Sequence, residues 1–359
     1  MRLGDVASVI MGQAPPSKSY NKQGRGVPFV KVAHFSTNYP EITEWTDEPK
    51  RMAQEGDVLI CVVGKVGVTN LGIDAAIGRS VAAIRPDDGK IDQSFLRHFL
   101  KSKILQFTHQ GQGAIQKVLT SKMLSEMKIP KTSIVEQKRI AAILDKADEI
   151  KTASSEAEKF KSNLIRSTFL ELFSEVEPNW PVVQLSDVAD ITCEFVTPTV
   201  PEFNELPHIG PDRIKGYTGE ILPYKSARED NVTSGKFHFS NNEILYSKIR
   251  PYLRKCTIPD FEGLCSADIY PLTPKEGIVK EYLWYLLLSD EFDRYTQTLP
   301  GRSSIPKLNR TELWRFSFHL PPITLQKEFA DVVNSVKNLA SIQDLAQEGV
   351  LSLVQELLT

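Results

Sequence analysis

The sequence lacks the features that mark secreted, membrane-spanning and disulfide-stabilised proteins. Its 359 residues include four cysteines, none of them in a CxxC pair, so we expect reduced, buried thiols at Cys61, Cys193, Cys256 and Cys265. The longest apolar run, Tyr282–Leu288, is far too short to cross a bilayer, and the first 16 residues lack the apolar segment of a secretory leader. We therefore expect a cytoplasmic protein that makes no contact with a membrane.

Motifs that carry chemistry are also missing. There is no phosphate-binding loop, no complete dinucleotide fingerprint, no Gly-x-Ser-x-Gly elbow and no Asn-Pro-Pro-Tyr-like tetrad of a DNA methyltransferase. The six histidines show no metal-ligand spacing. Asp88-Gly89-Lys90 resembles the acid-x-Lys of a nuclease, but it follows Pro86-Asp87, so a surface turn is the better interpretation. We expect no catalytic residue and no metal site in this chain.

The net charge and the length of the chain are both ordinary, but each limits what the protein can be. The net charge is −2, so any binding of nucleic acid must depend on local basic patches. The length exceeds that of one typical domain and suggests two domains, each with its own core.

The most informative feature is an internal duplication. Seven short segments of the first half recur in the second half, in the same order and at a nearly constant spacing. The pairs are LGDVA with LSDVA, EGDVLICVVGKVG with NNEILYSKIRP, VAAIRP with IYPLTP, FLRHFL with YLWYLL, GQGAIQKVL with GRSSIPKLN, MKIP with FHLP, and EQKRIAAIL with LQKEFADVV. Each pair alone is weak, but their common order indicates two copies of one unit, each a globular part followed by a helix.

Each globular part has the pattern of a small α+β domain with irregular connections. Short β-branched and apolar runs predict strands at Pro28–Ala33, Asp57–Val63, Val81–Ile84, Glu243–Ser247 and Ile269–Leu272. Helical periodicity predicts one helix per copy, at Asp92–Phe107 and Lys280–Thr298. Long loops at residues 12–26 and 212–236 separate these elements, and loops of that length are usually functional or disordered.

The helices that close the two copies share one apolar period. Alternating steps of four and three residues, the pattern of a coiled-coil seam, have the same phase in both helices. The seam residues are Ile143, Ala147, Ile150, Ala157 and Leu164 in the first helix, and Val332, Val336, Leu339, Ala346, Val350, Leu353 and Leu357 in the second. Such a helix could instead pack on its own domain, but the matching phase favours an antiparallel coiled coil of the two helices.

Basic and amide side chains recur in the loops, whereas no cluster of His, Asp or Cys does. Nine Lys and Arg residues face five Asp and Glu residues between Asp212 and Lys255, with aromatic residues interleaved. The residues predicted to contact DNA are Lys18, Lys22, Arg25, Lys31, Lys65, Gln112 and Lys117 in the first copy, and Lys215, Lys225, Lys248, Arg250, Arg302 and Lys307 in the second. Any one of them could be an ordinary solvated residue; as a group they fit phosphate positioning and base reading in a groove.

Lys65, Lys117, Lys248, Arg250 and Lys307 are the strongest of these predictions. They lie in strand-end or glycine-flanked loops in both copies, and the repeat aligns Lys117 with Lys307.

These segments resemble those of the specificity subunits of type I restriction-modification systems. The resemblance covers essentially the whole chain, and it depends on EQKRIAAIL after KIP, on the LGDVA and LSDVA openings, and on the GDVLI and NEILYSKIRP strands. It implies two target recognition domains at residues 1–135 and 176–322, separated by conserved helices at residues 136–175 and 323–359. The second copy has LQKEF where the first has EQKRI, so the surfaces that dock partner proteins are expected to differ.

The family resemblance also implies a function and a set of partners. Each domain would read one half of a bipartite site in double-stranded DNA, and the helices would set the spacing and dock two modification (methyltransferase) subunits, which restriction subunits join. S-adenosylmethionine, ATP and Mg²⁺ would belong to those partners, and this chain would need no cofactor. Two alternatives remain open at this stage: a fused or stand-alone restriction or methylation enzyme, and a coiled-coil scaffold that binds only protein.

Overall fold

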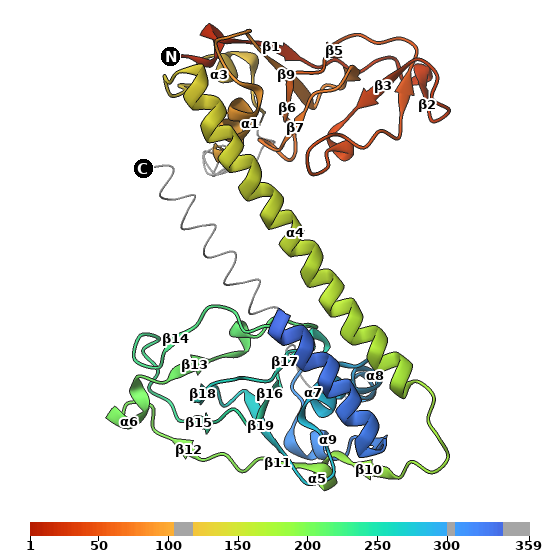
Figure 1. Ribbon diagram of the computed structural model, residues 1–359, viewed down its shortest axis with the longest axis vertical. Coiled ribbons are helices and arrows are strands. Elements are labelled where there is room, and N and C mark those ends of the chain that lie inside the picture. Colours follow the sequence, from red (N-terminus) through yellow and green to blue (C-terminus); the bar gives the residue numbers. More distant parts are fainter. Residues whose placement is uncertain (104–117, 300–305, 340–359) are drawn as a thin grey trace. The chain divides into compact units, whose positions relative to one another are not determined.

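The computed structural model describes residues 1–103, 118–299 and 306–339, and contacts divide these residues into two compact units (Figure 1). Unit 1 comprises residues 1–153 and unit 2 comprises residues 154–339. The boundary between them falls inside one continuous helix, α4 (Ile134–Phe173). We describe each unit by itself.

Unit 1 is built on an antiparallel four-stranded sheet in the order β1-β9-β6-β7. Its strands are β1 (Ala7–Met11), β9 (Val81–Pro86), β6 (Val58–Cys61) and β7 (Thr69–Leu71). All four residues of β6 are buried, which explains why its sequence is a continuous apolar run and not an alternating one. Helix α1 (Gln93–Ser102) packs its buried Leu96 and Leu100 into the same core, and Asp92 caps it by accepting a hydrogen bond from the Phe95 amide.

A second sheet of unit 1 has the order β2-β4-β3-β8-β5, and only β3 falls in a predicted strand. Its strands are β2 (Tyr20–Asn21), β4 (Trp45–Thr46), β3 (Val27–Val30), β8 (Ala75–Ile77) and β5 (Met52–Ala53). Strands β3 and β8 are parallel, and the other pairs are antiparallel. The remaining helices of this unit's globular part are η1 (Leu3–Asp5), η2 (Ser17–Ser19), η3 (Val32–His34) and α3 (Ser121–Ser125).

Unit 2 contains the same two sheets and a further β-pair. The four-stranded sheet has the order β11-β19-β16-β17, with β11 (Ala189–Asp190), β19 (Ile269–Pro274), β16 (Ile244–Ser247) and β17 (Cys256–Thr257). The five-stranded sheet has the order β12-β15-β18-β13-β14, with β12 (Phe195–Val196), β15 (Lys236–Phe239), β18 (Gly263–Cys265), β13 (Pro207–Ile209) and β14 (Lys225–Ser226). Strands β10 (Val182–Gln184) and β20 (Ser317–His319) form the pair. The helices are α5 (Leu185–Val188), α6 (Pro201–Asn204), η4 (Pro211–Arg213), η5 (Pro251–Leu253), α7 (Lys280–Leu288), α8 (Asp290–Thr298) and α9 (Arg310–Trp314).

The strand orders confirm the internal duplication. β1, β9, β6 and β7 correspond to β11, β19, β16 and β17, and the parallel pair β3 and β8 corresponds to β13 and β18. The two units differ at the edges of the second sheet, because β2 extends it beyond β4 whereas β12 extends its counterpart beyond β15. The scaffold is therefore shared, and the divergence lies in the outer strands and loops.

Three element predictions need correction. The strand predicted at Pro28–Ala33 ends at Val30, where the chain turns into η3. The helix predicted at Lys280–Thr298 is two helices, because Ser289 has extended backbone angles (φ −68°, ψ 162°) and its hydroxyl caps α8 at the Phe292 amide. The helix predicted to Phe107 ends at Ser102, and residues 104–107 lie outside the described part of the chain.

The long helices lie where the repeat predicts them: α4 has 40 residues, and the C-terminal helix is described over residues 323–339. In α4, the predicted seam residues Ile143, Ala147, Ile150 and Ala157 are half-buried; at the next steps Leu164 is exposed and Ile165 takes its place. In the C-terminal helix Val333 and Val336 are buried, Val332 is half-buried and Leu339 is exposed. Val333 is buried in place of the predicted Val332 because the helix face that carries Val333 packs on the core of unit 2. Ala346, Val350, Leu353 and Leu357 lie outside the described residues.

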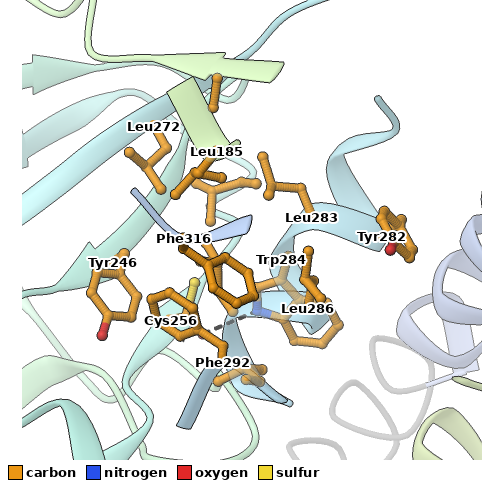
Figure 2. Close-up of a cluster of buried hydrophobic side chains, with 14 of the residues drawn as sticks. Leu185, Tyr246, Cys256, Leu272, Tyr282, Leu283, Trp284, Leu286, Phe292 and Phe316 are labelled. Atoms are coloured by element: carbon orange, nitrogen blue, oxygen red, sulfur yellow. Dashed lines mark hydrogen bonds between the residues drawn. The ribbon is translucent and has the colours of Figure 1, made fainter. Parts of the chain in front are cut away.

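The core of unit 2 joins both long helices to the globular part. Figure 2 shows part of it, including the hydrogen bond of 3.0 Å from the Trp284 indole to the Cys256 carbonyl. In this core Phe329, in the C-terminal helix, lies 5.4 Å from Phe169 and 5.9 Å from Phe173 between ring centroids. Since the two latter rings belong to the end of α4 and Phe329 belongs to the start of its helix, this is the contact that an antiparallel pair requires.

The cysteines agree with expectation at three of the four positions. Cys61, Cys256 and Cys265 are buried and free, but Cys193 is only partly buried because it precedes the edge strand β12. Burial still raises the pKa of Cys193 to about 12. Within the described residues, no helix is long and apolar enough to cross a membrane, and no three His, Cys, Asp or Glu side chains are grouped to hold a metal ion.

Candidate nucleic-acid interface

Three of the predicted DNA-contacting residues come together in unit 2. The loop that follows β16 pairs with residues 306–308: Ile249 bridges Lys307, the Leu308 amide donates to the Lys248 carbonyl at 2.8 Å, and the Arg250 amide donates to the Pro306 carbonyl at 2.8 Å. The side chains of Lys248, Arg250 and Lys307 are thus carried by two adjacent backbone segments. We call these three residues the basic cluster.

One carboxylate partly balances the charge of the basic cluster. Asp268 Oδ1 lies 3.6 Å from the Lys248 ammonium and 3.5 Å from the Lys307 ammonium. Lys248 also donates to the Ala267 carbonyl at 2.7 Å and lies 5.4 Å from the ring centre of Tyr270. Two lysines share this one aspartate, and Arg250 adds a third positive charge on the same loop as Lys248, so the surface is net positive and suits a polyanion.

The members of the basic cluster differ in exposure. The Lys248 side chain is 22% exposed and the Lys307 side chain is 54% exposed, and Arg250 is also exposed. Within the described part of the chain, Arg250 makes no ion pair and no side-chain hydrogen bond. Its guanidinium is therefore the one charge of the three that no carboxylate of the described residues pairs.

The loop between β16 and β17 is held in shape by Arg254. Its guanidinium donates to Asp290 at 2.6 Å, to Asp293 at 2.8 Å and to the Leu288 carbonyl at 3.3 Å. The pKa of Asp290 is lowered, chiefly because Arg254 donates this hydrogen bond to its carboxylate. Arg254 therefore stabilises the fold, whereas the side chain of Arg250, four residues earlier, has no partner among the residues that the structure describes.

The equivalent loop of unit 1 has the same connections and carries Lys65. Val63 bridges Val118, and the Leu119 amide donates to the Val62 carbonyl at 3.0 Å. These bonds place Val118, not Lys117, at the position equivalent to Lys307, so the alignment predicted from the sequence is wrong by one residue. Lys65 is exposed, and Lys117, Gln112 and Arg302 lie outside the described residues.

A second group of predicted contacts lies around β2. Lys18, Lys22 and Arg25 are all exposed, and Asn21 shapes their loop by accepting hydrogen bonds from the Gln23 amide at 3.2 Å and the Arg25 amide at 3.0 Å.

Lys31 and Lys215 are placed less favourably for contact with DNA. Lys31 forms an ion pair with Glu44 and its ammonium lies 4.9 Å from the Tyr20 ring centre, so its charge is already balanced inside the unit. Lys215 pairs with Glu220. Lys225, in β14, is exposed and forms no ion pair among the described residues.

Sequence reasoning missed the role of two glutamines. Gln137 and Gln326 follow the first turns of the long helices, and both are fully buried. Each accepts a hydrogen bond from the amide that begins the domain's own helix: Asp92 N to Gln137 at 2.9 Å, and Val279 N to Gln326 at 2.8 Å. We call this pair the glutamine latch. Its sequence signal is that EQKRI and LQKEF share only Gln and Lys, whereas the family resemblance points to this segment only as a docking surface.

The structure thus defines a duplicated two-unit protein, in which equivalent loops beside an antiparallel sheet carry the basic cluster in unit 2 and the exposed Lys65 in unit 1. The family model of the type I restriction modification DNA specificity domain matches residues 1–161 and again residues 177–348. The chain belongs to this family.

Individual relatives agree with this assignment. The type I restriction enzyme EcoDI specificity subunit of Escherichia coli is 34% identical over 172 residues, which are 48% of this chain and 37% of that protein. The MjaVIII specificity subunit of Methanocaldococcus jannaschii is 23% identical over 381 residues, covering 98% of this chain and 88% of that protein. Matches at more than 30% identity span only about a third of the relatives' own lengths.

A solved structure shares the fold. The crystal structure of the type I restriction-modification system S subunit from M. genitalium superimposes with a TM-score of 0.64 at 16% identity, over 100% of this chain and 94% of that one.

Proposed function

We propose that this chain is the DNA sequence-recognition subunit of a type I restriction-modification complex and that it has no catalytic activity of its own. The observation that carries the proposal is the basic cluster of Lys248, Arg250 and Lys307 in unit 2. It lies on a loop whose backbone bonds recur in unit 1 of the same family scaffold, where the loop carries Lys65. Cationic side chains on strand-end loops can bind phosphates and approach base edges. Each unit reads one half of a bipartite site in double-stranded DNA.

The proposed division of labour follows the duplication. Target recognition domains occupy residues 1–135 and 176–322, and the helices at 136–175 and 323–359 pair along the predicted seam, set the spacing and dock two modification subunits. Support for the pairing comes from the contact of Phe169 with Phe329 and from the half-buried seam of α4. Methylation would use S-adenosylmethionine on those partners, and restriction subunits would supply the ATP- and Mg²⁺-dependent steps in the cytoplasm.

Substituting Lys307→Ala tests the interface. Lys307 is exposed and shares Asp268 with Lys248, so we expect the complex with its modification subunits to bind DNA more weakly and with less dependence on salt. The slope of log K against log salt should fall by roughly one unit, nearly equally for all DNA sequences. Fluorescence anisotropy over a salt titration measures both quantities.

Lys122→Ala is the matched control. Lys122 in α3 is 82% exposed and faces Glu126 at 4.0 Å, so it loses a comparable exposed ion pair outside the basic cluster. An unchanged affinity and slope for Lys307→Ala, or an equal change for Lys122→Ala, would remove Lys307 from the interface.

A further inference from the structure

The loops that follow β6 and β16 have equivalent ends, although the loop of unit 2 is one residue longer and contains η5. One backbone hydrogen bond closes the base of each loop. The Cys61 amide donates to the Val68 carbonyl at 2.8 Å, and the Ser247 amide donates to the Lys255 carbonyl at 2.9 Å. The neighbouring strand pairs, Ile60 with Thr69 and Tyr246 with Cys256, fix the alignment of the two loops. Residues at each end of one loop can therefore be compared with those at the same end of the other.

Both loops need a left-handed backbone at each end. In unit 1 the two positions are Gly64 (φ +86°) and Gly67 (φ +91°), and in unit 2 they are Arg250 (φ +51°) and Arg254 (φ +46°). Glycine adopts this conformation without steric cost, whereas an arginine is strained there. Unit 2 thus holds two side chains at positions where the sister copy has none.

Arg254 offsets its strain with contacts inside the protein. It bonds Asp290, Asp293 and the Leu288 carbonyl, and its guanidinium lies 5.4 Å from the ring centre of Tyr217. The fold gains from this side chain, so its unfavourable backbone needs no further explanation.

Arg250 has no such compensation among the described residues. Its side chain is exposed and unpaired, while its backbone is fixed by the hydrogen bond to the Pro306 carbonyl and by the proline that follows it. Strained residues of this kind cluster at binding sites, where surrounding structure holds them in place. Since no described residue offsets this strain, we infer that the partner of the guanidinium is a ligand outside the chain.

We propose that Arg250 is the specificity-determining residue of unit 2, reading a guanine edge in the major groove of its half-site. This rests on the proposed function. A flexible lysine can bind a phosphate whatever its backbone conformation, and Lys248 and Lys307 beside Arg250 can do so. A guanidinium on a fixed backbone instead matches the paired acceptors O6 and N7 of guanine, which it can bind with two parallel hydrogen bonds.

Two substitutions separate base reading from charge and from stability. Arg250→Lys keeps the charge but not the planar fork, so we expect the preference for guanine at one position to fall by roughly 10- to 100-fold with an unchanged salt slope. Arg250→Gly removes the side chain and the strain together. It should lose the same preference while the thermal unfolding midpoint stays at or above that of the wild type. Arg254→Gly is the control, and its midpoint should fall because the bonds to Asp290 and Asp293 are lost.

The complex with its modification subunits is assayed on a randomised duplex library. If Arg250→Lys keeps the wild-type preference at every base, or if Arg250→Gly unfolds at a lower temperature, the assignment of Arg250 is overturned. If the wild-type complex itself shows no base preference in either half-site, the proposed function fails independently of Arg250. Loss of guanine preference at a single position, with the rest of the site still recognised, supports the proposal.

Discussion

Replacing Gln137 with leucine is expected to lower the free energy of unfolding of unit 1 by about 2–4 kcal/mol, one of the two largest effects that the structure predicts. The side chain is fully buried, accepts from the Asp92 amide at 2.9 Å, and donates to the carbonyls of Lys90 at 3.3 Å and Thr132 at 3.1 Å. Leucine is similar in size but leaves these groups without partners. An unpaired buried polar group costs about 1–3 kcal/mol.

The second copy provides a replicate of this experiment. Gln326 accepts from the Val279 amide at 2.8 Å and donates to the carbonyls of Gly277 at 3.3 Å and Pro321 at 2.8 Å. Gln326→Leu should therefore destabilise unit 2 by a similar amount. The same three bonds in both copies indicate that the glutamine latch fixes each long helix against the domain that precedes it.

Urea denaturation monitored by amide hydrogen exchange can assign each loss to one unit. The matched control is Lys138→Leu, which introduces the same side chain at the next, exposed position and should change stability by less than about 0.5 kcal/mol. If Gln137→Leu leaves the exchange of the Asp92 amide unchanged, the latch does not hold the start of α1.

Phe329→Ala is expected to destabilise unit 2 by about 3–5 kcal/mol, because it opens a cavity where three elements meet. Phe329 is fully buried, and its ring lies 5.4 Å from Phe169 and 5.6 Å from Tyr285. The substitution removes the ring that joins the C-terminal helix to both α4 and α7. The surrounding rings are fixed by their own packing and can collapse only partly into the space.

Chemical denaturation and proteolysis measure this second effect. Glu328→Ala is the control, since Glu328 is exposed on the same turn and should change stability by less than about 0.5 kcal/mol. We expect Phe329→Ala to expose the end of α4 to protease before unit 1 unfolds. Equal stability of the two variants would mean that the C-terminal helix is not docked through Phe329.

How far the sequence predicts the fold depends on the length of each element. Strands β6, β9, β16 and β19 were predictable because each is a buried run of four to six residues with its own pattern. The second sheet was not, because β2, β4 and β5 are two-residue strands that exist through pairing with distant segments. The break at Ser289 was missed for a related reason: apolar periodicity continues across it while the backbone does not.

The candidate site could be predicted in part by the same reasoning. Loops at strand ends singled out Lys248, Arg250 and Lys307, which the fold brings together. Lys31 shows the limit of the approach, since nothing near it in sequence shows that Glu44 neutralises it and that aromatic rings lie beneath it. The backbone conformation of Arg250 could not be foreseen, because left-handed arginines have no sequence signal.

The two cores become complete at different times during translation. The main core of unit 1 is built from residues between Leu3 and Ala141, so it can close as soon as the first turns of α4 have emerged. The core of unit 2 needs Phe169 from α4 and also Phe329 and Val333, which are translated some 160 residues later. Until then a large aromatic cluster remains uncovered on the nascent chain, where it is open to aggregation and to chaperones. Translation that stalls between Leu313 and Phe329 should therefore yield a chain whose first half is folded and whose second half is recruited by chaperones.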